Sequence, residues 1–310
     1  MENRGRIKSL DGATGIAIIL VVYGHLDFGI PSHLYMTIRE NIYNFHMSLF
    51  MFISGIVMNI SIEKHGKEHL FRSKIRRFFP KYILFSLLFF SADIFLSTKG
   101  FAQVVDLLIN IVLYPAKASA GFLWYLYVLT IYYIILPYIK KVTRRYTCLV
   151  LILSFLLTLI NLPSLFALDL IAKYLFFIFL SIVCFENWSK FLTNAQRYRF
   201  FSLILFVVLM AFSLNFGVVN GVFSILVVFG FSKVQANLGW LQYVGRNSMI
   251  IYLLNTAVMG AIYMLVTSLY EFEVNFLTSI PMALSGVLLP LLLNFSLDKF
   301  KLDKLKPFFK

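Results

Sequence analysis

Ten apolar segments alternate with shorter polar segments along this chain. Most of the apolar segments contain roughly 17–24 residues, close to the ~20 that cross a ~30 Å hydrocarbon core as an α-helix. Backbone N–H and C=O groups in lipid must be satisfied within their own segment, which favours helices. The pattern therefore predicts an all-α, polytopic transmembrane helix bundle of about ten spans. We place the spans at residues 12–30, 42–62, 80–97, 121–139, 147–162, 167–185, 200–216, 218–232, 247–268 and 275–297.

Two places interrupt this simple alternation. The apolar stretch Val104–Tyr114 is too short to span, so we expect an interfacial or re-entrant helix there, on the outer side. Only Gly217 separates the spans 200–216 and 218–232, which predicts a tight helical hairpin. One long kinked helix is the alternative at that point.

The charges of the chain report its orientation in the membrane. Only 14% of the residues are charged and 60% are hydrophobic, yet the net charge is +14. Of the 28 basic residues, all but Arg39, Lys99, Lys117 and Lys173 fall in the terminal segments or in the alternate loops on the same side. The positive-inside rule then places both termini in the cytoplasm. Topology accounts for the excess of basic residues, so no nucleic-acid partner is expected. Membrane lipids are the expected partners of these residues. With no internal repeat and no soluble appendage, residues 1–310 are predicted to form a single membrane-embedded domain.

Two histidines lie within or beside the first two predicted spans. An ionisable side chain in a span is costly and marks a functional-site candidate. His25 lies near the far end of the first span and His46 begins the second from the same side, which predicts a shared reaction chamber. Asp11 and Thr14 lie near the same helix face as His25 and mark a polar inner entrance. The alternatives are a structural hydrogen bond from His25 to a neighbouring helix and an interfacial position for His46.

No metal site is predicted. Two imidazoles are fewer ligands than a metal requires. Asp27, His33 and Glu40 are expected in a loop, where nothing directs their side chains toward one point. Cys148 and Cys184 both lie within apolar runs and suggest neither a disulfide framework nor a metal knot.

Further polar and aromatic residues are candidates for contacts with substrate. Ser248, Tyr252 and Asn255 recur at i, i+4 and i+7 on one face of the ninth span, where they line a tunnel or form interhelical hydrogen bonds. Asp93, at the outer end of the third span, is a candidate for contact with the acceptor. Trp124, at the outer edge of the fourth, stacks on a sugar or belongs to an aromatic belt.

Several of these segments resemble the acyltransferase-3 family of integral membrane O-acyltransferases. The resemblance covers essentially the whole chain, and its two most specific motifs are those of the first two spans. The matching segments are Leu10–His25 (LDGATGIAIILVVYGH), Phe45–Gly55 (FHMSLFMFISG), the basic stretch Phe71–Pro80, Leu123–Leu126 (LWYL) and Ser248–Leu254 (SMIIYLL).

The resemblance implies an acyltransferase, commonly an O-acetyltransferase, that uses cytoplasmic acetyl-CoA or another acyl-CoA as donor substrate and holds no permanent cofactor. It implies a sugar acceptor, a cell-surface polysaccharide or its lipid-linked precursor, and a multi-pass position in the bacterial inner membrane. By the same resemblance His25 is the catalytic histidine. From its chemistry we expect His25 to act as general base or to take the acyl group itself and pass it on, while His46 orients it or polarises the thioester carbonyl. The chain departs from the family twice: Thr14 stands where Arg or Lys is usual, and Asn255 stands where the late motif often has His.

The basic stretch is then a candidate for the donor site. Guanidinium groups suit phosphate oxygens, so Arg76 and Arg77, just before Pro80 at an expected helix entrance, are predicted to bind the phosphates of CoA. Asp11 and Thr14, at the inner entrance, are further candidates for contact with the acyl-CoA donor. Topology or attraction to anionic lipid is the alternative for the basic stretch.

Two other classes of function remain open on the sequence. One is a proton-coupled transporter of glycans or amphiphiles, in which the histidines relay protons, although transporters often show duplicated halves and this chain does not. The other is a catalytically silent relative, which the replacement at Thr14 keeps open.

Overall fold

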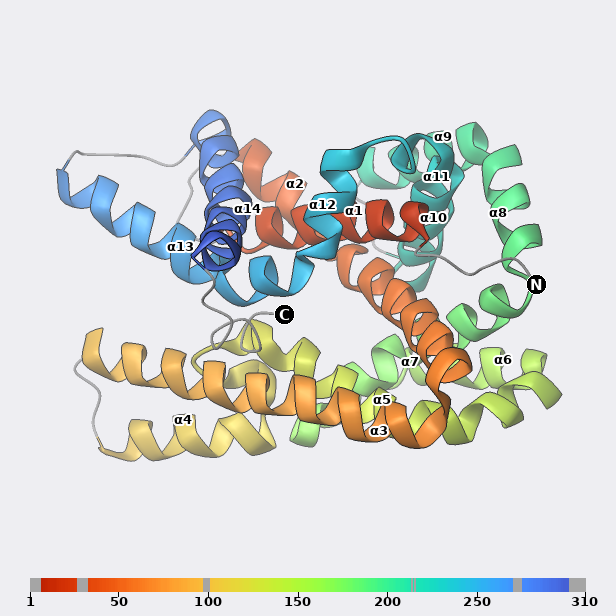
Figure 1. Ribbon diagram of the computed structural model, residues 1–310, viewed down its shortest axis with the longest axis horizontal. Coiled ribbons are helices and arrows are strands. Elements are labelled where there is room, and N and C mark those ends of the chain that lie inside the picture. Colours follow the sequence, from red (N-terminus) through yellow and green to blue (C-terminus); the bar gives the residue numbers. More distant parts are fainter. Residues whose placement is uncertain are drawn as a thin grey trace. The chain divides into compact units, whose positions relative to one another are not determined.

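The computed structural model describes residues 7–26, 33–96, 101–212, 214, 216–269 and 275–300, and within these ranges the fold is all-α (Figure 1). Three 3₁₀ turns (η1 Pro115–Lys117, η2 Gly121–Leu123 and η3 Leu165–Ala167) accompany the α-helices. The α-helices are α1 Lys8–Gly24, α2 His33–Tyr43, α3 His46–Leu96, α4 Phe101–Leu113, α5 Trp124–Arg145, α6 Thr147–Leu157, α7 Leu168–Glu186, α8 Trp188–Arg197, α9 Arg199–Ala211, α10 Val218–Gly230, α11 Ser232–Gln235, α12 Gly239–Arg246, α13 Ser248–Leu269 and α14 Phe276–Lys299.

Among the described residues, 6 helical segments are long and apolar enough to cross a membrane, which makes the chain a multi-pass membrane protein. They cover the predicted spans 42–62, 80–97, 121–139, 167–185, 247–268 and 275–297, apart from a residue or two at some ends. The other four predicted spans are also helical. Of these, α1 has 17 residues and lies at the lower limit of a span, whereas α6, α9 and α10 have 11, 13 and 13 residues and are short for one. A total of ten spans and the cytoplasmic position of the termini therefore stay predictions.

Three local expectations meet the structure directly. The helical hairpin is confirmed, because α9 and α10 are separate helices that pack together, and Gly217 between them has a φ of +45°. Its connection is longer than the single residue predicted, since α9 already ends at Ala211. The loop expected around His33 and Glu40 is wrong, since both residues lie in α2; Asp27 lies outside the described residues. The helix entrance expected at Pro80 is also wrong, because α3 continues through that proline and breaks its helical geometry earlier, at Gly66 (φ +75°).

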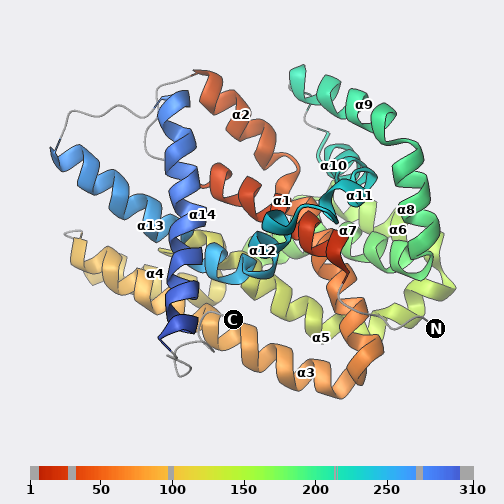
Figure 2. The same cartoon turned by 45° about the horizontal axis from the view of Figure 1, so that its top comes forward.

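The described chain divides into two compact units, residues 1–53 with 188–310 and residues 54–187. In the first unit, α1 is the central helix and packs against α2, α10, α11, α12, α13 and α14 (Figures 1 and 2). Its buried face is formed by small and aliphatic residues such as Ala13, Ala17 and Ile18, each with an exposed fraction of 0%. The pattern that predicted a span thus produces a helix surrounded by other helices.

Glycines allow α1 and α12 to approach backbone to backbone. A Cβ atom placed on Gly245 would lie 1.9 Å from the carbonyl oxygen of Asp11, and one on Gly15 would lie 2.3 Å from the carbonyl oxygen of Leu241. Real side chains cannot occupy such positions, so only glycine fits there. Gly15 therefore serves helix packing, and its partner Gly245 lies 230 positions away.

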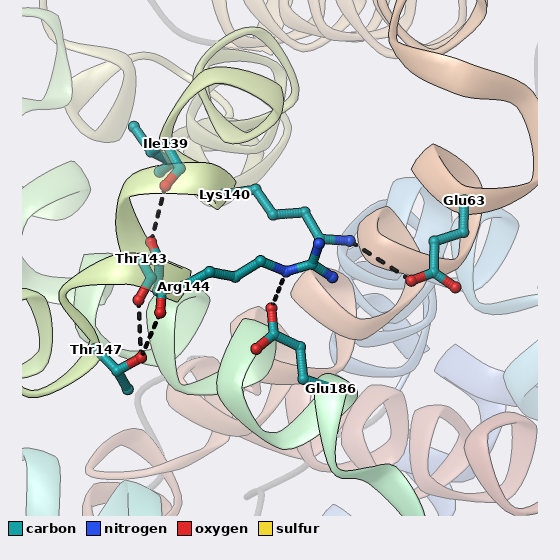
Figure 3. A network of polar contacts seen from close by, with 7 residues as sticks. All are labelled: Glu63, Ile139, Lys140, Thr143, Arg144, Thr147 and Glu186. Atoms are coloured by element: carbon teal, nitrogen blue, oxygen red, sulfur yellow. Dashed lines mark hydrogen bonds and ion pairs between the residues drawn. The ribbon is translucent and has the colours of Figure 1, made fainter.

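In the second unit, two ion pairs join three helices. The Lys140 ammonium on α5 lies 3.8 Å from the Glu63 carboxylate on α3, and Arg144 on α5 pairs with Glu186 on α7 (Figure 3). The sequence places all four residues at ends of spans that share one membrane face. The contacts join those ends, as the predicted alternation requires.

Candidate active site

His25 caps the C-terminal end of α1 in the first unit. Its backbone N–H donates to the carbonyl oxygen of Val21 at 3.0 Å, which holds the residue on the last turn of the helix. Its side chain is half-buried, and its Nδ1 atom lies 3.1 Å from Oδ1 of Asn255 on α13. The structure therefore joins the first motif of the sequence to the polar stripe of the ninth predicted span.

The orientation of the Asn255 amide determines which nitrogen of His25 carries a proton. Asn255 is fully buried, and its Nδ2 group donates to the carbonyl oxygens of Ile251 at 2.9 Å and Tyr252 at 2.8 Å. Its Oδ1 is thus the atom that faces His25, and an amide oxygen only accepts hydrogen bonds. Nδ1 of His25 must donate, so in the neutral ring Nε2 is the basic nitrogen. A histidine with a purely structural role would make the same contact, and in this tautomer Nε2 is the nitrogen that can act as a general base.

Tyrosine and serine side chains pack around the end of α1 that bears His25. The buried Tyr35 on α2 donates its hydroxyl to the carbonyl oxygen of Leu26, next to His25 in the chain, and its ring lies 5.5 Å from that of Tyr23. The Tyr23 hydroxyl lies 3.4 Å from Oγ of Ser279 on α14. The end of α1 that bears His25 is thus held by α2, α13 and α14.

His46 is the first residue of α3 and has an exposed fraction of 2%. Its Nδ1 atom lies 2.8 Å from the carbonyl oxygen of Ile42, and because a carbonyl only accepts, Nδ1 must donate. The Tyr43 ring lies edge-on to the imidazole at 5.0 Å. The catalytic and interfacial interpretations of His46 both stay predictions, and the ring is held in one tautomer against α2.

The other predicted residues of the first unit are placed less directly. The Thr14 hydroxyl donates to the carbonyl oxygen of Leu10 at 2.8 Å, so it is satisfied within its own helix. The main chain of Asp11 lies against Gly245. Tyr252 is buried on the same helix as Asn255, and Ser248 is the first residue of that helix. A donor contact for Asp11 or Thr14 and a tunnel position for Ser248 or Tyr252 stay predictions.

Asp93 and Trp124 belong to the second unit. Oδ2 of Asp93 accepts a hydrogen bond from the Ser119 hydroxyl at 2.9 Å, and the half-buried Trp124 ring stacks on Tyr174 with a centroid distance of 5.4 Å. Each is held by a local partner. Their predicted contacts with the acceptor stay predictions.

The basic stretch of α3 divides between two helix faces. Lys74, Arg77 and Lys81 recur at i, i+3 and i+7 and share one face, whereas Arg76 lies about 100° around the helix from Arg77. Lys74 lies over the ring of Tyr133 at 5.9 Å. Lys81 has an exposed fraction of only 4%, and its ammonium finds no hydrogen-bond partner among the described residues. The sequence had assigned Lys81 to topology alone.

Comparison with known proteins decides the family. A family model described as an acyltransferase domain matches residues 7–297. The chain belongs to the acyltransferase-3 family. No curated protein and no solved structure matches the chain. The match covers both compact units and every predicted site residue, so the molecule is a membrane acyltransferase.

Within this acyltransferase-3 chain, sequence reasoning missed a charged residue beside His25. Arg39 on α2 donates from Nε to the carbonyl oxygen of Gly24 at 3.0 Å. A signal was present, because Tyr35, Ile38 and Ile42 follow a helical spacing that would have indicated α2 and directed attention to its charges.

Among the described residues, no group of three or more His, Cys, Asp or Glu side chains could hold a metal ion.

Proposed function

We propose that this membrane acyltransferase transfers an acetyl group from cytoplasmic acetyl-CoA to a hydroxyl of a cell-surface polysaccharide or of its lipid-linked precursor, in the bacterial inner membrane. The observation that carries the proposal is the contact between His25 and Asn255. It fixes the neutral imidazole as a proton acceptor at Nε2. Membership of the family supports acyl transfer. The resemblance of the sequence motifs is the basis for proposing the acetyl group, the acetyl-CoA donor and the glycan acceptor.

In the proposed reaction His25 activates the acceptor. Nε2 takes the proton of a sugar hydroxyl while the hydroxyl oxygen attacks the thioester carbonyl, because a hydroxyl is a poor nucleophile until it loses that proton. The carbon–sulfur bond then breaks, and the proton passes from the imidazolium to the departing CoA thiolate. The products are the O-acetyl sugar and free CoA. Asn255 stabilises the imidazolium by accepting from Nδ1 throughout.

His46 assists in this proposal. Its ring is buried and Nδ1 donates to the carbonyl oxygen of Ile42, so Nε2 is the basic nitrogen when the ring is neutral. A protonated His46 could polarise the thioester carbonyl, and a neutral one could orient the acceptor.

The donor side of the proposal uses the face of α3 formed by Lys74, Arg77 and Lys81. Three cations on one face suit the phosphate groups of CoA, and a buried ammonium with no hydrogen-bond partner gains most from an anion. Arg76 and Arg77 are both exposed, but Arg76 lies on a different face from Lys74 and Lys81, so we favour Arg77 for the donor role.

The test is transfer of radiolabelled acetyl groups from acetyl-CoA in membranes that contain the protein. We expect label in the glycan fraction with the wild-type protein and none with His25→Ala, while the exposed His65→Ala variant serves as the matched control and stays active. Full activity of His25→Ala would contradict the assignment. Glycan movement without labelling would favour a transporter, and neither activity would favour a silent relative.

Mass spectrometry of the surface polysaccharide, with and without the protein, identifies the product. The expected difference is one acetyl group per modified sugar. A difference that corresponds to a longer acyl chain would keep the reaction and change the donor.

A further inference from the structure

Helix α2 places a guanidinium against the end of α1 that bears His25. The Nε–H of Arg39 donates to the carbonyl oxygen of Gly24 at 3.0 Å. Carbonyls at a helix C-terminus lack intrahelical partners and attract positive charge, and α1 has no basic residue in its own last turn. Arg39 supplies from a second helix the cation that α1 lacks, one residue before His25.

The same guanidinium lies over the ring of Tyr43, one helical turn along α2. The distance from the central carbon of Arg39 to the ring centroid is 5.2 Å, within the range of a cation–π contact. The i, i+4 spacing puts the two side chains on one face of α2. Arg39 is thus held by two partners at once.

Tyr43 in turn touches the segments of both histidines. Its Cε2 atom lies 3.3 Å from the position that a Cβ would take on Gly24, so its ring packs directly on the last turn of α1. The ring also lies edge-on to the His46 imidazole, with centroids 5.0 Å apart and an interplanar angle of 74°. Arg39 and Tyr43 therefore connect the main chain before His25 to the ring of His46.

We propose that Arg39 and Tyr43 form a bracket that fixes His25 and His46 relative to each other, with Arg39 as a positioning residue for acyl transfer. The inference rests on the proposed function for its kinetic consequence. A misplacement of about 1 Å at a reacting group costs on the order of 100-fold in rate. A residue that aligns the two imidazoles without binding substrate should affect kcat and leave the KM for acetyl-CoA unchanged.

The kinetic test compares Arg39→Met with Arg39→Lys in the labelled transfer assay. We expect Arg39→Met to lower kcat about 10- to 100-fold with the KM for acetyl-CoA within twofold of wild type. Lys keeps the charge but cannot donate from an Nε within a planar fork, so Arg39→Lys should recover part of the rate. Arg199 is the matched control, because it also donates to a backbone carbonyl (Gln196, 3.1 Å) and lies over an aromatic ring (Phe200, 4.7 Å) in the same unit. Arg199→Met should keep its rate.

A double variant tests whether the two residues act as one device. Tyr43→Leu removes the ring and should lower kcat as Arg39→Met does, and the combination should be no slower than the slower single variant. Effects that multiply would overturn the bracket. So would an unchanged kcat, or a raised KM with unchanged kcat, in Arg39→Met.

An activity-free measurement separates this inference from the proposed function. Nitrogen NMR of histidine-labelled protein, with His25 and His46 assigned by their Gln variants, should show both imidazoles shifted in Arg39→Met and neither in Arg199→Met. Shifted signals without any acetyl transfer by the wild type would refute the proposed function and keep the bracket. Unchanged signals would refute the bracket even if the wild type is active.

Discussion

Nδ1 of His25 and Oδ1 of Asn255 lie 3.1 Å apart although 230 positions of sequence separate the two residues. The contact joins the end of α1 to the middle of α13. It gives the histidine a defined tautomer because the Asn255 amide is itself fixed by two carbonyl oxygens of its own helix.

Replacing Asn255 with Leu should lower kcat about 10- to 100-fold, because the imidazole loses the acceptor that fixes its orientation and its Nδ1 proton. The KM for acetyl-CoA should not change. Asn255→His, which restores the residue common in the family, should be faster than Asn255→Leu because an imidazole nitrogen can also accept from Nδ1. Asn59→Leu is the matched control, since Asn59 is equally buried and its Nδ2 also donates to the carbonyl four residues earlier. Equal losses in both Leu variants would indicate a general packing effect.

Neutralising Arg77 should raise the apparent KM for acetyl-CoA roughly tenfold, a loss of about 1.4 kcal/mol in binding. Arg76→Gln should leave KM within twofold, since Arg76 lies on a different face of α3. Steady-state rates at varied acetyl-CoA measure both. An unchanged KM in Arg77→Gln would assign the basic face to lipid or topology.

Lys81→Met should raise the KM for acetyl-CoA and at the same time raise the melting temperature of the donor-free protein. The wild-type ammonium is buried without a hydrogen-bond partner among the described residues, so its removal relieves a desolvation cost. Thermal unfolding in detergent and the kinetic assay report the two effects separately. Higher stability with unchanged KM would remove Lys81 from the donor site.

Gly245→Ala should destabilise the protein by at least about 1–3 kcal/mol, since the new methyl group would overlap the carbonyl oxygen of Asp11 and force α1 away from α12. Gly260→Ala is the control, because a Cβ there meets nothing within 4 Å. The helix should then gain about 0.5–1 kcal/mol from the loss of glycine. Thermal unfolding of the two variants compares them, and similar melting temperatures would show that the contact with α12 is unimportant.

The periodicity of the apolar residues predicted the helices well, because it depends on local sequence alone. The segment 167–185 became α7 with ends within a residue of the prediction. The hairpin at Gly217 was also foreseen, because a single glycine between two apolar runs is a local signal. Span length was less predictable, as at α6, where the helix ends at Leu157 although the apolar run continues to 162.

Contacts between distant segments could not be predicted in this way. His25 and Asn255 were each recognised as candidates, but nothing in either helix states that they meet. The sequence around Gly245 gives no sign of its role, because the contact that requires a glycine there is made with α1. Arg39 was missed for a different cause: its segment is polar enough to be interpreted as a loop, and only the helix α2 directs that side chain to the carbonyl of Gly24.

The carboxamide of Asn255 has no proton to gain or lose near neutral pH, unlike the imidazole that relatives often carry at this position. A pair of histidines would share protons and ionise as a coupled system. In this chain the pair consists of one imidazole, His25, and one neutral amide, Asn255. Of these two side chains, only His25 can gain a proton on acidification. Relatives with His at this position would differ from this enzyme in how many ionisations shape their dependence on acidity.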